Sequence, residues 1–202
     1  MAKLWYFYGT MGSSKSAQLL MTAYNYEEKG LVPLVLKPQM DTRDGKKVIK
    51  SRIGLTRKVE FVEDYLIAPF EIVKERLQGY DVVIIDEIQF CDVSLVPILN
   101  RIVEEIQIPV MCYGLYDDFM LNPFPISKEL KSQKYVELRE LKTVCWCGDG
   151  ATCNARINSK GEVVKKGKTI QLGGNDRYIS LCLKHYREGD IGDYARKKLI
   201  KV

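Results

Sequence analysis

Residues 9–16, Gly-Thr-Met-Gly-Ser-Ser-Lys-Ser, nearly match the phosphate-binding pattern G-x-x-x-x-G-K-[ST]. In that pattern backbone N–H groups surround the phosphates, the lysine reaches the outer phosphates and the last hydroxyl binds Mg²⁺. Gly9, Lys15 and Ser16 fit, whereas Ser14 stands where the second glycine belongs. That position favours a residue that tolerates unusual backbone angles, so we expect strain at the serine. Because ordinary polar turns between a strand and a helix also produce such matches, the loop alone leaves both interpretations open.

Two carboxylates follow a second apolar run, the stretch Asp-Val-Val-Ile-Ile-Asp-Glu at residues 81–87. Ligands of parallel sheets bind at the carboxyl ends of the strands, so both carboxylates are expected to face the same crevice as the loop. Asp86 is suited to support Mg²⁺ together with Ser16. Strand alternation turns Glu87 elsewhere, free to accept a proton from an attacking hydroxyl. The alternative is a helix N-cap, but the acid and Lys15, each at the end of its own strand, together favour a nucleotide site.

A third group has the residue types of a metal site. Cys145-Trp-Cys147 is followed, after 34 residues, by Cys182-Leu-Lys-His185. Two close pairs separated by a longer insert are typical of a tetrahedral structural zinc site, which supplies folding free energy to a module without a large core. The C-x-C spacing departs from the usual C-x₂₋₄-C, so Cys153 is a rival ligand, and the first pair could instead be small apolar strand residues. The chain has a single histidine, and its place beside a cysteine favours metal.

The elements that must position these residues are visible as apolar runs alternating with stretches of helical spacing. This alternation predicts an α/β fold, a parallel sheet with helices on both faces. The expected strands are residues 4–8, 32–36, 82–85, 109–113 and 135–141, and the expected helices are residues 17–28, 66–77 and 93–106. The charged segment 41–60 is expected to be a loop or a small excursion.

After residue 141 the composition changes to cysteines, glycines and short alternating strands, expected at 169–172 and 179–183. We therefore expect a nucleotide-binding α/β domain at residues 1–141, a zinc-binding module at 142–188 and a C-terminal tail at 189–202 that is helical with a basic end.

Composition limits the class of protein. The 202 residues are 46% hydrophobic and 28% charged, as in a soluble globular protein, and no apolar run approaches the roughly 20 residues that span a bilayer. The N-terminus leads directly into a strand, so we expect a cytoplasmic protein without a membrane partner. The net charge of +5 is dispersed apart from a lysine cluster at 165–168 and the tail. Without an aromatic stripe or a recognition motif, we expect no nucleic-acid partner.

With these motifs in place, the chain resembles the zinc-containing type II thymidine kinases over almost its whole length. The loop 9–16 and the segment Asp-Glu-Ile-Gln-Phe at 86–90 match family motifs, as do residues 41–43 and 51–54. Tyr-Gly-Leu-Tyr-Asp-Asp-Phe at 113–119, with Pro-Phe at 123–124, resembles the nucleoside pocket. Gly-Gly-Asn-Asp-Arg-Tyr at 173–178 and Cys-Leu-Lys-His-Tyr at 182–186 resemble the substrate loop and the second metal half. Several motifs in the right order are far more specific than any one.

The resemblance implies a P-loop NTPase-like sheet with a small C-terminal zinc-binding lid. It implies ATP-dependent phosphorylation of the 5′-hydroxyl of thymidine, and of deoxyuridine, in pyrimidine salvage. It also implies Mg²⁺, structural Zn²⁺, a homotetramer and feedback inhibition by dTTP. A bacterial branch of the family shares the C-x-C spacing, which favours the ligand set Cys145, Cys147, Cys182 and His185.

The same resemblance assigns roles to individual residues, with Glu87 as the catalytic base. The expected cofactor-binding residues are Gly9, Thr10, Met11, Gly12, Ser13, Ser14, Lys15, Ser16, Asp86 and Gln89. The expected substrate-binding residues are Met11, Arg43, Phe90, Leu115, Phe119, Phe124, Thr169, Ile170, Gln171, Leu172, Gly173 and Tyr178.

Some of these residues have simpler alternatives. Phe119 and Phe124 could be core residues, Tyr178 a strand residue, and Arg43 a surface charge like Arg52. Two other functions compete with a nucleoside kinase, namely a phosphate-loop ATPase that couples hydrolysis to motion, and a zinc ribbon that binds nucleic acid. The scattered charge argues against the zinc ribbon.

Overall fold

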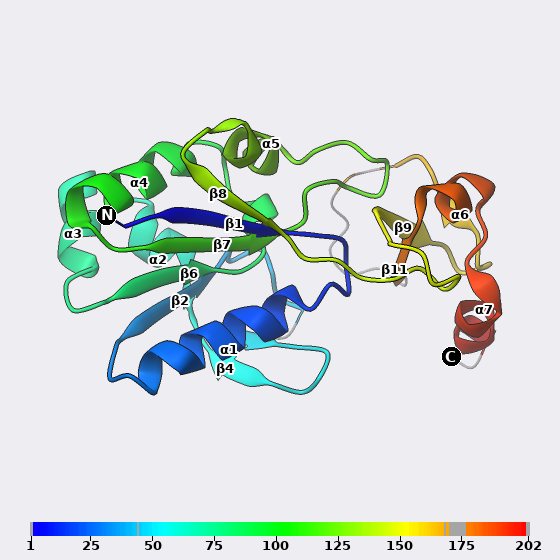
Figure 1. Ribbon diagram of the computed structural model, residues 1–202, viewed down its shortest axis with the longest axis horizontal. Coiled ribbons are helices and arrows are strands. Elements are labelled where there is room, and N and C mark those ends of the chain that lie inside the picture. Colours follow the sequence, from blue (N-terminus) through cyan, green and yellow to red (C-terminus); the bar gives the residue numbers. More distant parts are fainter. Residues whose placement is uncertain (1, 44, 168, 170–176, 201–202) are drawn as a thin grey trace.

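The main sheet has six parallel strands in the order β5-β2-β6-β7-β1-β8 (Figure 1). The computed structural model describes residues 2–43, 45–167, 169 and 177–200. The strands are β1 (Leu4–Tyr8), β2 (Pro33–Lys37), β5 (Glu60–Phe61), β6 (Val82–Ile85), β7 (Val110–Gly114) and β8 (Val136–Glu140). The predicted parallel sheet is confirmed, and the expected strands match within about two residues.

Helices cover both faces of this sheet (Figure 1). One face carries α1 (Lys15–Glu27), and the other carries α2 (Val62–Leu66), α3 (Phe70–Arg76), α4 (Leu95–Arg101) and α5 (Pro125–Ser132). The central strand β6 divides its side chains between the two cores. Val82 and Ile84 pack with α1, whereas Val83 and Ile85 pack with the other helices. All four are fully buried, which explains why this strand is a continuous apolar run.

Two predicted helices are interrupted. The helix expected from residue 66 begins only at Phe70 as α3, because Leu66 is the last residue of α2 and Pro69 precedes α3. Proline lacks an N–H group and disfavours helical angles in the residue before it. The expected helix 93–106 begins as α4 and ends in a π-helical turn, Ile102–Ile106. The expected loop 41–60 contains a hairpin of β3 (Val48–Lys50) and β4 (Thr56–Lys58).

The chain after residue 141 forms its own small sheet at the opposite end of the molecule from α3 and α4 (Figure 1). Its antiparallel strands are β9 (Cys153–Ile157), β10 (Val163–Val164) and β11 (Arg177–Leu181), followed by α6 (Leu183–Glu188) and α7 (Gly192–Ile200). The strand expected at 169–172 falls outside the described residues except for Thr169. No helix in the described part of the chain is both long and apolar enough to cross a membrane.

Candidate functional site

The loop between β1 and α1 folds around the side chain of Lys15. This buried ammonium group donates hydrogen bonds to Thr10 O at 2.7 Å, Gly9 O at 3.1 Å and Ser13 Oγ at 3.3 Å. Gly9 is required because a Cβ atom there would lie 2.2 Å from the carbonyl oxygen of Leu141. Burial lowers the pKa of Lys15 to about 8. The Lys15 ammonium group is therefore bound by three oxygen atoms of the loop itself, and phosphate oxygens could take the place of these acceptors.

The expected strain at Ser14 is confirmed, since this residue has φ 62° and ψ 21° in the left-handed region. Gly12 is also left-handed, with φ 77°. The left-handed turn at Gly12 therefore does not remove the backbone strain at Ser14. Both positions have the backbone angles that glycine tolerates best.

The carboxyl end of β6 brings the first acidic residue to the start of α1. Ser16 Oγ donates a hydrogen bond to Asp86 Oδ2 at 2.9 Å. Burial, and then the charge of Glu87, raise the pKa of Asp86 to about 7. A divalent cation beside this carboxylate would favour its ionised form. The hydroxyl and the carboxylate are hard oxygen ligands of the kind that Mg²⁺ prefers, so this pair fits Mg²⁺.

Glu87 follows in a left-handed conformation, with φ 51°, at the turn into the short 3₁₀ helix Ile88–Phe90. Its carboxylate is held from two sides. Arg43 Nη2 donates to Glu87 Oε1 at 2.5 Å, and Gln89 Nε2 donates to Glu87 Oε2. The arginine is fixed in turn by Asp41, at 2.7 Å from its Nε. The sequence named Glu87 as the base but neither of these two partners, and its role as base stays a prediction.

Gln89 was expected to bind the cofactor, and its side chain is not among those that line the pocket. It is 3% exposed, and its Oε1 accepts a hydrogen bond from the backbone N–H of Leu115 at 2.9 Å. Both ends of the amide are therefore committed to protein partners. A Cβ atom on Gly114 would lie 2.6 Å from Gln89 Oε1, so a glycine is needed for this arrangement.

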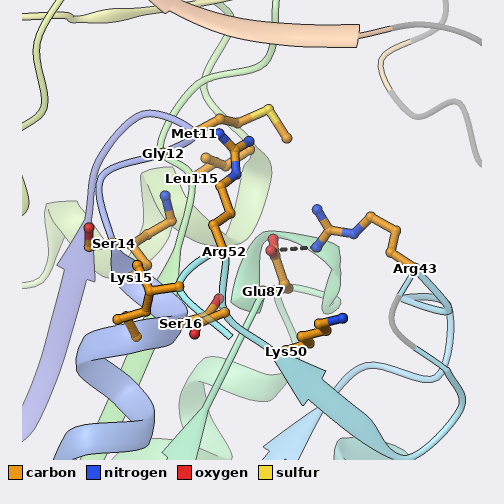
Figure 2. Close-up of a pocket in the computed structure, with 13 residues that line it drawn as sticks. Met11, Gly12, Ser14, Lys15, Ser16, Arg43, Lys50, Arg52, Glu87 and Leu115 are labelled. Carbon is orange, nitrogen blue, oxygen red and sulfur yellow. Dashed lines mark hydrogen bonds and ion pairs between the residues drawn. The ribbon is translucent and has the colours of Figure 1, made fainter. Parts of the chain in front are cut away.

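These elements enclose a pocket of about 210 Å³ (Figure 2). Four basic side chains line it together with one carboxylate, and Figure 2 shows Arg43 reaching Glu87 across from the loop. The excess of positive charge suits a polyphosphate. The lining residues are Met11, Gly12, Ser14, Lys15, Ser16, Ala17, Arg43, Lys50, Ser51, Arg52, Ile53, Glu87 and Leu115.

A separate cluster in the C-terminal module has the donor set of a metal site. One ligand atom from each of Cys145, Cys147, Cys182 and His185 lies within 4.8 Å of the others. His185 Nδ1 is 3.2 Å from the sulfur of Cys182 and 3.5 Å from that of Cys145. Three thiols and one imidazole are the ligands of a structural zinc site. The rival Cys153 is outside this cluster, with its sulfur 3.7 Å from the hydroxyl of Thr152.

Comparison with known proteins identifies the family. A family model described as thymidine kinase matches residues 2–186. The chain belongs to the thymidine kinase family. Among its relatives, thymidine kinases of Pasteurella multocida and Haemophilus influenzae are 40% and 41% identical, and each match covers 93% of this chain. The matches cover 98% and 97% of those relatives. A Pif1 helicase from Candida albicans is 17% identical with a TM-score of 0.44, over 71% of this chain and 36% of the helicase, which is too distant to carry weight.

Several residues that the thymidine kinase resemblance assigned to the substrate do not line this pocket. Phe119 is 1% exposed beneath the guanidinium of Arg156, whose carbon lies 3.9 Å from the ring centroid. Phe124 is buried and meets the ring of Phe90 edge-on at 6.3 Å. Tyr178 lies in β11 and pairs with Arg156 across the sheet. The simpler interpretations as core and strand residues match these positions, and contact of these side chains with a nucleoside stays a prediction.

The expected substrate segment 169–173 is described only at its first residue. Thr169 Oγ1 donates a hydrogen bond to Asp118 Oδ2 at 3.2 Å, which joins the C-terminal module to the segment after β7. Residues 170–173 lie outside the described part of the chain, so their role is a prediction.

Several residues at the site were not assigned from the sequence. Lys50 lines the pocket from the hairpin, and its basic character was the available signal. Arg52, in a segment that matches a family motif but with no role assigned to it, lines the pocket as well. Asn154 and Ser180 contact the backbone of Met11 from the C-terminal module. No sequence signal could have revealed that contact, since it joins residues more than 140 positions apart.

Proposed function

We propose that the protein transfers the γ-phosphate of ATP to the 5′-hydroxyl of thymidine, and also of deoxyuridine. One observation carries the proposal: in a chain of the thymidine kinase family, a loop lysine, a serine hydrogen-bonded to a buried aspartate, and a second carboxylate meet at one basic pocket, which the lysine, the serine and the second carboxylate line. Phosphoryl transfer needs mainly positioning, charge stabilisation and a base for the hydroxyl, and this set provides each of them.

Phosphate binding falls to the loop and to the basic side chains around it. Lys15 already points its ammonium group at three oxygens of the loop, and phosphate oxygens would take over as acceptors. The backbone N–H groups at the start of α1 add donors and the positive end of the helix dipole. Arg52 lines the same pocket and would offset the negative charge that spreads over the transferred group.

Ser16 and Asp86 would hold Mg²⁺, which when bound neutralises charge on the phosphate oxygens. Burial disfavours the ionised form of Asp86, so this carboxylate gains more from a nearby cation than an exposed one would. The 2.9 Å hydrogen bond between Ser16 Oγ and Asp86 Oδ2 supports this assignment, because it holds the two oxygen atoms next to each other.

Glu87 would accept the proton of the 5′-hydroxyl as the hydroxyl attacks the phosphate. Arg43 and Gln89 hold one carboxylate oxygen each, which fixes the direction in which the base points. Arg43 also lies on the pocket wall and would contact the nucleoside or its phosphate.

The remaining parts of the proposal rest on the family resemblance and on the metal cluster. Cys145, Cys147, Cys182 and His185 would hold Zn²⁺, which would supply folding free energy to a module whose own core is small. The module at 142–188 would act as a lid, with Tyr178 and residues 169–173 against the base. We further propose a cytoplasmic homotetramer that dTTP inhibits at this site.

The direct test is to incubate purified protein with ATP, Mg²⁺ and a panel of nucleosides, and to separate the products by chromatography. We expect thymidine and deoxyuridine to be converted to their monophosphates, with one ADP formed for each. Loss of ATP that is independent of nucleoside would contradict the proposal and would favour a phosphate-loop ATPase.

A further inference from the structure

The C-terminal module holds the phosphate loop by its backbone. The backbone N–H of Met11 donates to Asn154 Oδ1 at 2.7 Å, and the hydroxyl of Ser180 donates to the carbonyl oxygen of Met11. Asn154 lies in β9 and Ser180 in β11, directly opposite each other in the antiparallel register. One rung of the small sheet therefore engages both polar groups of a single loop residue.

Asn154 is well suited to hold this position. It is 3% exposed, and its Nδ2 donates to the carbonyl oxygen of Asp117 at 3.0 Å. The amide thus joins three segments: the module, the phosphate loop and the chain that follows β7. Because a buried polar group that loses its partner is costly, this contact resists displacement.

The contact falls where the loop most needs support. Met11 directly precedes Gly12, which has φ 77°, and Ser14 two residues later has φ 62°. Glycine adopts such angles freely, but a serine persists in the left-handed region only when its surroundings hold it in place. Two hydrogen bonds from outside the loop fix the peptide groups on either side of Met11. They also commit the N–H of Met11 to Asn154, so this N–H is not one of the donors that would face the phosphates.

We propose that Asn154 and Ser180 are positioning residues for ATP. By holding the backbone of Met11 they set the conformation of the phosphate loop. The C-terminal module would thereby contribute to ATP affinity as well as acting as a lid. This inference rests on the proposed function, since it names what the loop binds. Neither side chain lines the pocket, so both act through Met11.

The test compares Ser180→Thr with Ser180→Val, two variants of the same shape of which only threonine keeps the hydroxyl. Asn154→Leu removes the other contact, and Ser159→Ala, at an exposed site in the same module, is the control. The dissociation constant of ATP is measured by calorimetry without nucleoside. Thermal unfolding and zinc content are measured on the same samples.

We expect Ser180→Val and Asn154→Leu to weaken ATP binding by roughly three- to tenfold each, the effect of losing one hydrogen bond, while zinc content stays at the wild-type level. Ser180→Thr and Ser159→Ala should bind ATP as the wild type does. A purely structural role would lower the unfolding temperature and leave ATP affinity unchanged. Wild-type affinity in both Ser180→Val and Asn154→Leu would overturn the inference.

A second measurement separates this inference from the proposed function. Hydrogen exchange of the Met11 amide is followed in the protein without nucleotide. We expect slow exchange in the wild type and faster exchange in Asn154→Leu. Equal exchange rates would overturn the inference. A wild-type protein that protects this amide but binds no ATP would overturn the proposed function and the link to ATP, and would leave only the part of the inference in which Asn154 holds the backbone of Met11.

Discussion

Replacing Ser14 by glycine is expected to stabilise the protein. Ser14 has φ 62°, its side chain is exposed, and it makes no capping hydrogen bond to α1. The substitution therefore changes the backbone preference and little else. A left-handed backbone costs an L-residue about 1–2 kcal/mol. Glycine loses more conformational entropy on folding than serine does, and this loss offsets about 0.5–1 kcal/mol of the strain energy that the substitution removes.

The free energy of unfolding of Ser14→Gly should therefore rise by about 0.5–1 kcal/mol. For a chain of this length that corresponds to about 2 °C in the unfolding temperature. Urea unfolding of the nucleotide-free protein, with zinc supplied, gives the value if the denaturant slope is unchanged.

Two controls isolate the backbone effect. Ser14→Ala removes the same hydroxyl but keeps the Cβ atom, so its stability should stay within about 0.5 kcal/mol of the wild type. Gly12→Ala introduces a side chain at φ 77° and should lose about 1 kcal/mol. A Ser14→Gly protein no more stable than Ser14→Ala would refute the assignment of backbone strain to Ser14.

Three further predictions concern charge, metal and packing. Burial lowers the pKa of Lys15 to about 8, so this side chain loses its positive charge as pH rises above 8. Calorimetric titrations should then show ATP affinity falling by up to about tenfold per pH unit. The same lowered pKa means that the charged Lys15 destabilises the folded protein at neutral pH, and this destabilisation should be relieved between pH 8 and 10.5. Cys145→Ser should lose bound zinc and unfold at lower temperature, whereas Cys153→Ser should retain zinc, as measured by elemental analysis; the reverse result would overturn the ligand set. Gly114→Ala should lose about 1–3 kcal/mol of stability by overpacking, and it should lower kcat by displacing Gln89, which holds the proposed base. Gly150→Ala, with no atom within 4 Å of its Cβ, should change neither the free energy of unfolding nor kcat.

The parts of the fold that follow from local pattern could be predicted from the sequence. Buried parallel strands need apolar residues on both faces, so β6 is visible as an uninterrupted apolar run. The loop and the acidic strand end are short motifs whose relative position follows from the parallel topology. The hydrogen bond between Ser16 and Asp86 bears out that inference.

Other features depend on the backbone and on distant contacts. The left-handed turn at Glu87 redirects the residues after β6, so strand alternation could not reveal that Gln89 and Arg43 both donate hydrogen bonds to the Glu87 carboxylate. The hydrogen bond between Asn154 and Met11 joins residues 143 positions apart. Contacts of this kind depend on how two separate sheets meet, which no local pattern encodes.

The most direct test of the account compares thymidine phosphorylation by the wild type and by Glu87→Gln, with ATP binding measured on both. Glutamine preserves the shape of the side chain but cannot accept the hydroxyl proton. We expect the wild type to form thymidine monophosphate, and the variant to bind ATP normally while kcat falls by about 10²–10⁴-fold, the contribution of a general base. Wild-type turnover by Glu87→Gln would contradict the assigned mechanism, and a wild-type protein that forms no thymidine monophosphate would contradict the proposed function itself.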